Sequence, residues 1–172
     1  MRPFDLDDTE KCLFAKWSYS DYYVLLLNNT GIPEGYTPTN ANSSADTWHI
    51  PQLPAAYSVN PTHVPGLYYA WYGSPTRVTP EAVKADVIAA IKRLRPTLNS
   101  TTQGDPQIVR FNSHSPFKLV VGAEDIKEGF YDRLWGLQGN RNTYYTGAAF
   151  IEHSAPVLWN YTLGVVNNMV EV

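Results

Sequence analysis

The run of residues 140–161 most constrains how this chain can fold. Residues 142–145 contain Thr and Tyr, which favour β-strands, and Gly147 with two alanines ends the predicted strand without side-chain bulk. Ser154 and Pro156 then mark the start of a helix. An anion or a polarised carbonyl suits a helix N-terminus, because unpaired N–H groups and partial positive charge lie there. The sequence therefore predicts a nucleotide or cofactor cradle, with an ordinary strand end as the alternative.

A resemblance to a known family favours the cofactor cradle over an ordinary strand end. The run from Gly129 to Phe150, GFYDRLWGLQGNRNTYYTGAAF, followed by Ser154, Leu158 and Trp159, resembles the C-terminal end of FAD-dependent oxidoreductases of the flavin amine oxidase superfamily. It is most similar to the largely fungal branch related to β-cyclopiazonate dehydrogenase. The match is specific over residues 120–162 and looser back to about residue 48.

The resemblance implies FAD as cofactor, because in that family the matching strand and helix close the flavin site. The helix N-terminus there points at the pyrimidine edge of the isoalloxazine ring. Carried onto this sequence, the implied cofactor-binding residues are Thr146, Gly147, Ala148, Ala149, Ser154, Val157 and Leu158. The superfamily pattern often has an acid two residues after the strand's glycine, where this chain has Ala149. That departure argues against an ordinary monoamine oxidase and leaves the amine nature of the substrate open.

Catalytic and substrate-contacting residues are less constrained by the sequence. His153 is a candidate catalytic residue because it immediately precedes the predicted cofactor-facing helix and can titrate near neutral pH. Tyr69 and Trp71, in a strand with aromatic residues on both faces, are candidates to line the substrate, with ordinary core packing as the alternative. The implied partners are a small organic substrate and oxygen as reoxidant. The four histidines lack the spacing of a metal site.

Composition excludes several other classes. The 172-residue chain is 44% hydrophobic, as in ordinary globular domains, and its formal charge of -3 gives no reason to expect nucleic acid. No apolar run approaches the ~20 residues of a transmembrane helix, and no signal peptide is evident. Cys12, the only cysteine, is expected to be a small buried hydrophobe. Four glycosylation sequons permit a secretory location without establishing one: Asn28, Asn42, Asn99 and Asn160.

The predicted fold class is α+β. We expect a mixed β-sheet and a capped helix over residues 79–94 in a partial substrate-binding region, residues 12–118. Residues 119–172 are expected to supply the closing strand and helix of an incomplete, Rossmann-like FAD-binding region. The strands are predicted over residues 12–27 (one strand or a pair), 55–59, 67–72 and 107–113, the last ended by a turn at residues 114–116. The further helices are predicted over residues 124–137 and 156–169.

The Gly-x-Gly-x-x-Gly turn of a dinucleotide-binding domain has no match in the sequence. We therefore expect the chain to be the C-terminal part of a longer flavoenzyme, read from a truncated gene, or to be completed by another chain. The helix over residues 156–169 is apolar nearly all round, which predicts burial against something larger. The alternative from another class is a non-catalytic remnant or a secreted, aromatic-rich binding module.

Overall fold

The computed structural model describes residues 5–41 and 47–170, which divide into two compact units. One unit comprises Met1–Tyr19 with Lys118–Val172, and the other comprises Ser20–Phe117. We call them the terminal unit and the sheet unit. Each has its own hydrophobic core, so each is described by itself. The sequon at Asn42 lies outside the described residues.

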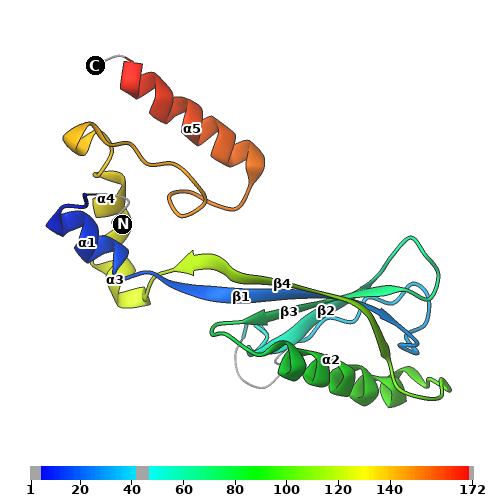
Figure 1. The fold of residues 1–172 in the computed structure, drawn as a ribbon. Helices are drawn as coiled ribbons and strands as arrows, with labels where there is room; N and C mark the ends of the chain where they lie inside the picture. The colour runs from blue at the N-terminus through cyan, green and yellow to red at the C-terminus, as the bar shows by residue number, and fades with distance from the viewer. Residues whose placement is uncertain (1–4, 42–46, 171–172) are drawn as a thin grey trace. The chain divides into compact units, whose positions relative to one another are not determined.

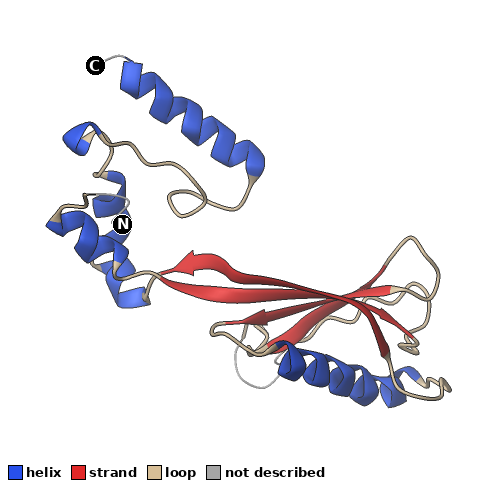
Figure 2. Cartoon of the chain, viewed as in Figure 1, coloured by secondary structure: helices blue, strands red, loops and turns tan. Residues whose placement is uncertain are grey.

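The sheet has four strands in the order β2-β3-β1-β4 (Figures 1 and 2). Their bounds are β1 Ser18–Asn28, β2 Ala55–Pro61, β3 Tyr68–Ser74 and β4 Gln107–Val120. The α+β class is confirmed, but the sheet is antiparallel rather than mixed. A short connection joins β2 to β3, and a connection of that length can only join antiparallel neighbours. The strand predicted over 67–72 is β3, an inner strand of the sheet.

Helix α2, Pro80–Leu94, covers one face of this sheet (Figure 1). Thr79 caps it as predicted, because the Thr79 side chain accepts a hydrogen bond from the amide of Ala82. One stripe of the helix is buried against alternate residues of β1 and β3. That stripe is Val83, Val87 and Ile91, and the facing strand residues are Tyr23, Leu25, Leu27, Tyr68, Ala70 and Tyr72.

The N-terminal part of the strand predicted over 12–27 is instead helix α1, Asp8–Phe14. Asp7 and Glu10 form a capping box, in which each side chain accepts a hydrogen bond from the other residue's backbone amide. This capping box stabilises a helix rather than a strand at these residues. Cys12 lies on the outer side of α1 and is exposed, so its predicted burial is wrong.

The helix predicted over 124–137 is divided into α3, Ala123–Lys127, and α4, Phe130–Trp135. Gly129 separates them with a left-handed φ of 77°, which costs a glycine little but strains other residues. An added Cβ there would meet only Asp132 Oδ2, at 3.6 Å, so the backbone conformation is the reason for the glycine.

Strand β4 continues to Val120 through the turn predicted at residues 114–116. It lies at the edge of the sheet, where a proline such as Pro116 is tolerated because an outward N–H is not required. The remaining elements are two short 3₁₀ helices, η1 Arg95–Leu98 and η2 Asn140–Asn142, and the final helix α5, Ala155–Val170.

Helix α5 begins where Ser154 and Pro156 predicted. It contains no charged residue, and none of its described residues is buried. Trp159 is 74% exposed, and Leu163, Val166 and Met169 are each about half exposed. An apolar surface of this size on a helix is typical of one that contacts another polypeptide. Of the helices that the structure describes, none is long and apolar enough to cross a membrane.

Two glycine substitutions should shift stability in opposite directions. We expect Gly129→Ala to lower the free energy of unfolding by about 1–2 kcal/mol, the cost of a left-handed conformation for an L-residue. Gly164→Ala should raise it by up to about 1 kcal/mol, since alanine favours a helix interior and its Cβ would enter open space. Urea unfolding of both variants measures the two effects. Equal effects of the two substitutions would contradict the conformational role of Gly129.

Candidate functional site

The predicted strand over residues 142–145 is absent. Residues 140–142 form the 3₁₀ helix η2, in which Arg141 and Asn142 have positive φ values of 52° and 57°, and residues 143–150 follow as an irregular segment. We call residues 143–150 the connecting segment. No strand among the described residues pairs with it, so its backbone groups must find other partners.

Tyr145 is the best-anchored residue of the connecting segment. Its backbone amide donates to Gln138 Oε1 at 2.8 Å, and its carbonyl accepts from Gln138 Nε2 at 2.7 Å. Its ring stacks on Phe150, with centroids 5.1 Å apart, and meets Phe14 of α1 edge-on at 5.7 Å. Polar and aromatic contacts from distant parts of the chain therefore hold this tyrosine.

Glu10 completes the anchorage from α1. It is only 3% exposed, and it accepts hydrogen bonds from the Tyr145 hydroxyl at 2.5 Å and from the Asp7 amide at 2.6 Å. Arg141 Nη1 lies 3.9 Å from a Glu10 oxygen. A buried carboxylate requires such partners. Burial first, and then the hydrogen bond to Glu10, raises the pKa of Tyr145 to about 12.

The predicted cofactor-binding residues all lie in the terminal unit. Thr146 is exposed, and its hydroxyl lies 2.5 Å from the Thr162 hydroxyl of α5. Gly147 has φ 118°, and an added Cβ would have no heavy atom within 4 Å. Ala148 and Ala149 are half-buried. The backbone is therefore open to approach at Gly147, although the segment is not a strand. The cofactor-binding role of these residues stays a prediction.

The start of α5 adds a helix N-terminus to the same unit. The carbonyl of Ser154 accepts the first helical hydrogen bond, from the amide of Leu158 at 2.8 Å. The amides of Ala155 and Val157 therefore precede the helix's own hydrogen-bonding pattern. The first turn contains no acid, so the partial positive charge there is not offset. Leu158 is half-buried and Val157 is 40% exposed.

His153 is exposed, one residue before Ser154. Its catalytic role stays a prediction. No group of three or more His, Cys, Asp or Glu side chains among the described residues could hold a metal ion.

Tyr69 and Trp71 lie in the sheet unit, on the face opposite α2, which we call the open face. Along β3, Tyr68, Ala70 and Tyr72 are buried under α2, while Tyr69 is 43% exposed and Trp71 is half-buried. The two residues therefore belong to the surface of the sheet rather than to its core.

The open face also contains a group of aromatic rings from all four strands. Tyr22 lies with its ring centroid 4.9 Å from that of Phe117, 5.6 Å from that of His114 and 6.4 Å from that of Tyr57. Tyr57 is in turn 6.4 Å from Trp71. Burial, followed by a hydrogen bond to Tyr22, raises the pKa of Tyr57. Sequence reasoning identified only Trp71 of this group, because the others become neighbours through strand pairing.

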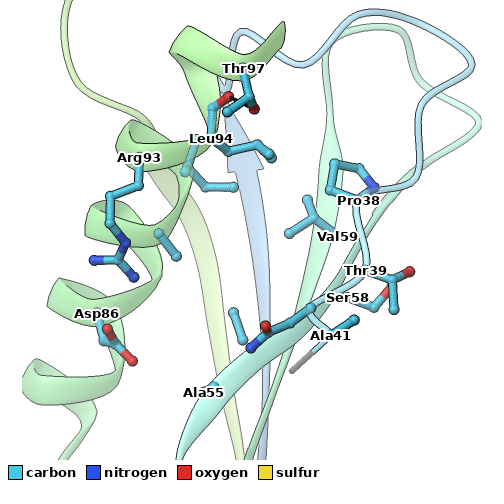
Figure 3. A pocket seen from close by; sticks show the side chains of 14 residues that line it. Pro38, Thr39, Ala41, Ala55, Ser58, Val59, Asp86, Arg93, Leu94 and Thr97 are labelled. Carbon is cyan, nitrogen blue, oxygen red and sulfur yellow. Dashed lines mark hydrogen bonds between the residues drawn. The ribbon is translucent and has the colours of Figure 1, made fainter. Parts of the chain in front are cut away.

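A groove of about 400 Å³ in the sheet unit was not predicted (Figure 3). It lies between α2, β2 and residues 38–41, and it is hollow because four of its lining residues are alanines: Ala41, Ala55, Ala56 and Ala90. Asp86 and Arg93 lie two helical turns apart on its α2 wall. Burial, then the nearby Asp86 carboxylate, raises the pKa of Tyr72 to about 12. Only Ala55 and Ala56 are adjacent in the sequence, so the groove forms through tertiary contacts.

Comparison with known proteins gives relatives of one kind. The chain is 42% identical over 167 residues to the FAD-dependent oxidoreductase pigF of Monascus ruber, a match covering 96% of this chain and 36% of the relative. It is 42% identical to the FAD-dependent oxidoreductase oblC of Cochliobolus heterostrophus, covering 93% and 34% respectively. It is 31% identical to β-cyclopiazonate dehydrogenase of Aspergillus oryzae, covering 96% and 36%. The chain is homologous to part of these fungal FAD-dependent oxidoreductases.

The resemblance stated from the sequence is thereby confirmed. The chain spans about a third of the length of the curated relatives it matches. A crystal structure of a CLA-producing fatty acid isomerase from P. acnes matches with a TM-score of 0.65 at 20% identity, covering 95% of this chain and 37% of that protein. At that identity the likeness shows the fold alone. No protein-family model matches the sequence.

The anchored tyrosine should make stability depend on pH in the alkaline range. The pKa of Tyr145 lies near 12 in the folded chain and at its ordinary 10.0 when unfolded. The stability contributed by this group is therefore full below about pH 10 and is lost as pH rises toward 12. In urea unfolding, we expect Tyr145→Phe to lose less free energy of unfolding than the parent chain between about pH 10 and pH 12. Tyr36→Phe, in an exposed loop, should lose as much as the parent chain. The same alkaline slope in all three proteins would contradict the assignment.

Proposed function

We propose that this chain forms part of the flavin site and part of the substrate surface of an FAD-dependent oxidoreductase. The observation that carries the proposal is its 42% identity, over 96% of its length, to proteins of that name. Residues 119–172 would contribute to the FAD-binding region, and residues 12–118 to the substrate-binding region. The remaining two-thirds of such an enzyme would come from a longer chain or from a partner chain.

The residues of the terminal unit fit a cofactor such as FAD in two respects. Open space over Gly147 lets a large planar group approach the backbone of the connecting segment. The N-terminal amides of α5 can donate hydrogen bonds to a carbonyl edge or an anionic group. Thr146, Gly147, Ala148 and Ala149 would hold one side of the group, and Ser154, Val157 and Leu158 the other.

The substrate we propose is a small organic molecule with an oxidisable carbon–nitrogen or carbon–carbon centre. Bound FAD would accept a hydride from it, with oxygen as reoxidant, and that chemistry is the cofactor's. The chain's own contribution is binding and orientation. The rings of the open face, with Tyr69 and Trp71 among them, offer apolar contact area with little conformational freedom to lose. His153, beside the α5 N-terminus, is the proposed proton-handling group.

Burial in the whole enzyme would account for the exposed apolar surface of α5. Its uncharged and exposed surface would pack against polypeptide that corresponds to the remainder of the relatives. This role agrees with the expectation, drawn from sequence, that the helix is buried against something larger.

FAD binding by the purified chain tests the proposal. We expect the chain to quench the fluorescence of added FAD and to retain a visible flavin band through gel filtration. Ala148→Glu should weaken FAD binding by about tenfold or more, since it adds bulk and negative charge where the cofactor would lie. Ala85→Glu, on the exposed side of α2, is the matched control and should bind as the parent does.

Two outcomes would count against the proposal. A chain with normal circular dichroism that binds no FAD would show that these residues do not form a flavin site by themselves, and would favour a non-catalytic binding module. Equal weakening by Ala148→Glu and Ala85→Glu would place any FAD binding elsewhere.

A further inference from the structure

Gln138 lies three residues beyond the end of α4 and takes the place of a missing strand. In an antiparallel sheet, two facing residues exchange both of their backbone hydrogen bonds. Gln138 makes the equivalent pair with its side chain, accepting from the Tyr145 amide at 2.8 Å and donating to the Tyr145 carbonyl at 2.7 Å. The reverse orientation of the carboxamide would place oxygen against oxygen and N–H against N–H, so these contacts define one orientation.

The same carboxamide also reaches α5. Gln138 Nε2 lies 2.8 Å from the Tyr161 hydroxyl, which accepts its second N–H. One residue farther along both segments, the Thr146 and Thr162 hydroxyls are 2.5 Å apart. Gln138 therefore joins the connecting segment to α5 at the point where the exposed part of that segment begins.

Trp135, in the last turn of α4, holds the other end of the connecting segment. Its indole Nε1 donates to the carbonyl of Phe150 at 2.8 Å. Tyr145 and Phe150 are thus both fixed from α4 and its C-terminal extension, while Gly147 between them has open space above it. The shape of the exposed backbone depends on these two side chains, because no sheet supports it.

We propose that Gln138 is a positioning residue, which holds the connecting segment and α5 in the arrangement that receives the flavin. This inference rests on the proposed function for its cofactor. It assigns to Gln138 no contact with the cofactor and no chemical step. Its effect on FAD would pass through the backbone of residues 145–147.

Two variants separate the hydrogen bonds of Gln138 from its volume. Gln138→Met keeps a side chain of similar length, but its thioether has no N–H to donate and is only a weak hydrogen-bond acceptor. Gln138→Glu keeps an acceptor for the Tyr145 amide and loses the donor to the Tyr145 carbonyl and to Tyr161. Gln107→Met, at the exposed start of β4, is the matched control.

Hydrogen exchange measured by mass spectrometry tests whether Gln138 fixes residues 143–150, and it requires no cofactor. We expect the amides of residues 143–150 to exchange about tenfold faster in Gln138→Met, because local opening becomes easier. Exchange should be at least as fast in Gln138→Glu, because its second carboxylate oxygen would face the Tyr145 carbonyl oxygen. Peptides of α2 should exchange as in the parent. FAD titrations should show affinity about tenfold weaker in both Gln138→Met and Gln138→Glu, and unchanged in Gln107→Met.

Each result decides one part of the inference. Unchanged exchange over residues 143–150 in Gln138→Met would overturn the positioning role, whatever FAD does. Faster exchange with unaltered FAD affinity would overturn the link to the cofactor. If the parent chain binds no FAD, the proposed function fails together with that link, and exchange alone decides whether Gln138 fixes the segment. Should Gln138→Met not fold, Gln138→Glu still carries the comparison.

Discussion

The terminal unit depends on one constraint: the backbone of the connecting segment has no strand beside it. Buried backbone polar groups are costly unless they are hydrogen-bonded, so side chains from outside the segment must satisfy them. Gln138 and Trp135 bond its carbonyls and amides, and Glu10 of α1 bonds the Tyr145 hydroxyl. This explains why residues near the N-terminus belong to the same unit as residues 118–170.

The sheet unit follows a simpler rule, because strand alternation divides its residues between two faces. One face is closed by the apolar stripe of α2. The other presents rings of Tyr22, Tyr57 and Trp71 without a helix over them. These three rings are half-buried, while Tyr69 and Phe117 beside them are 43% and 41% exposed.

Two routes from the sequence lead to relatives of the same kind. The pattern of residues 129–159 indicated a flavin-dependent oxidoreductase, and relatives of that name match nearly all of the chain. Neither route identifies a substrate. The structure adds three physical features: an approachable backbone at Gly147, a helix N-terminus with no acid in its first turn, and an uncharged α5 with exposed apolar side chains.

The sequence by itself determined the elements whose signals are local. The cap and apolar stripe of α2, the start of α5 at Ser154, and the strand over β3 all followed from side-chain type and spacing, because caps and periodicity act within a few residues. Tertiary structure decided the rest. Gly129 adopts a left-handed conformation between α3 and α4, and β4 continues past Pro116. The strand expected at 142–145 is replaced by a segment that Gln138 and Glu10 hold through hydrogen bonds. Those outcomes depend on which distant groups meet, and local propensity is too weak to specify such contacts.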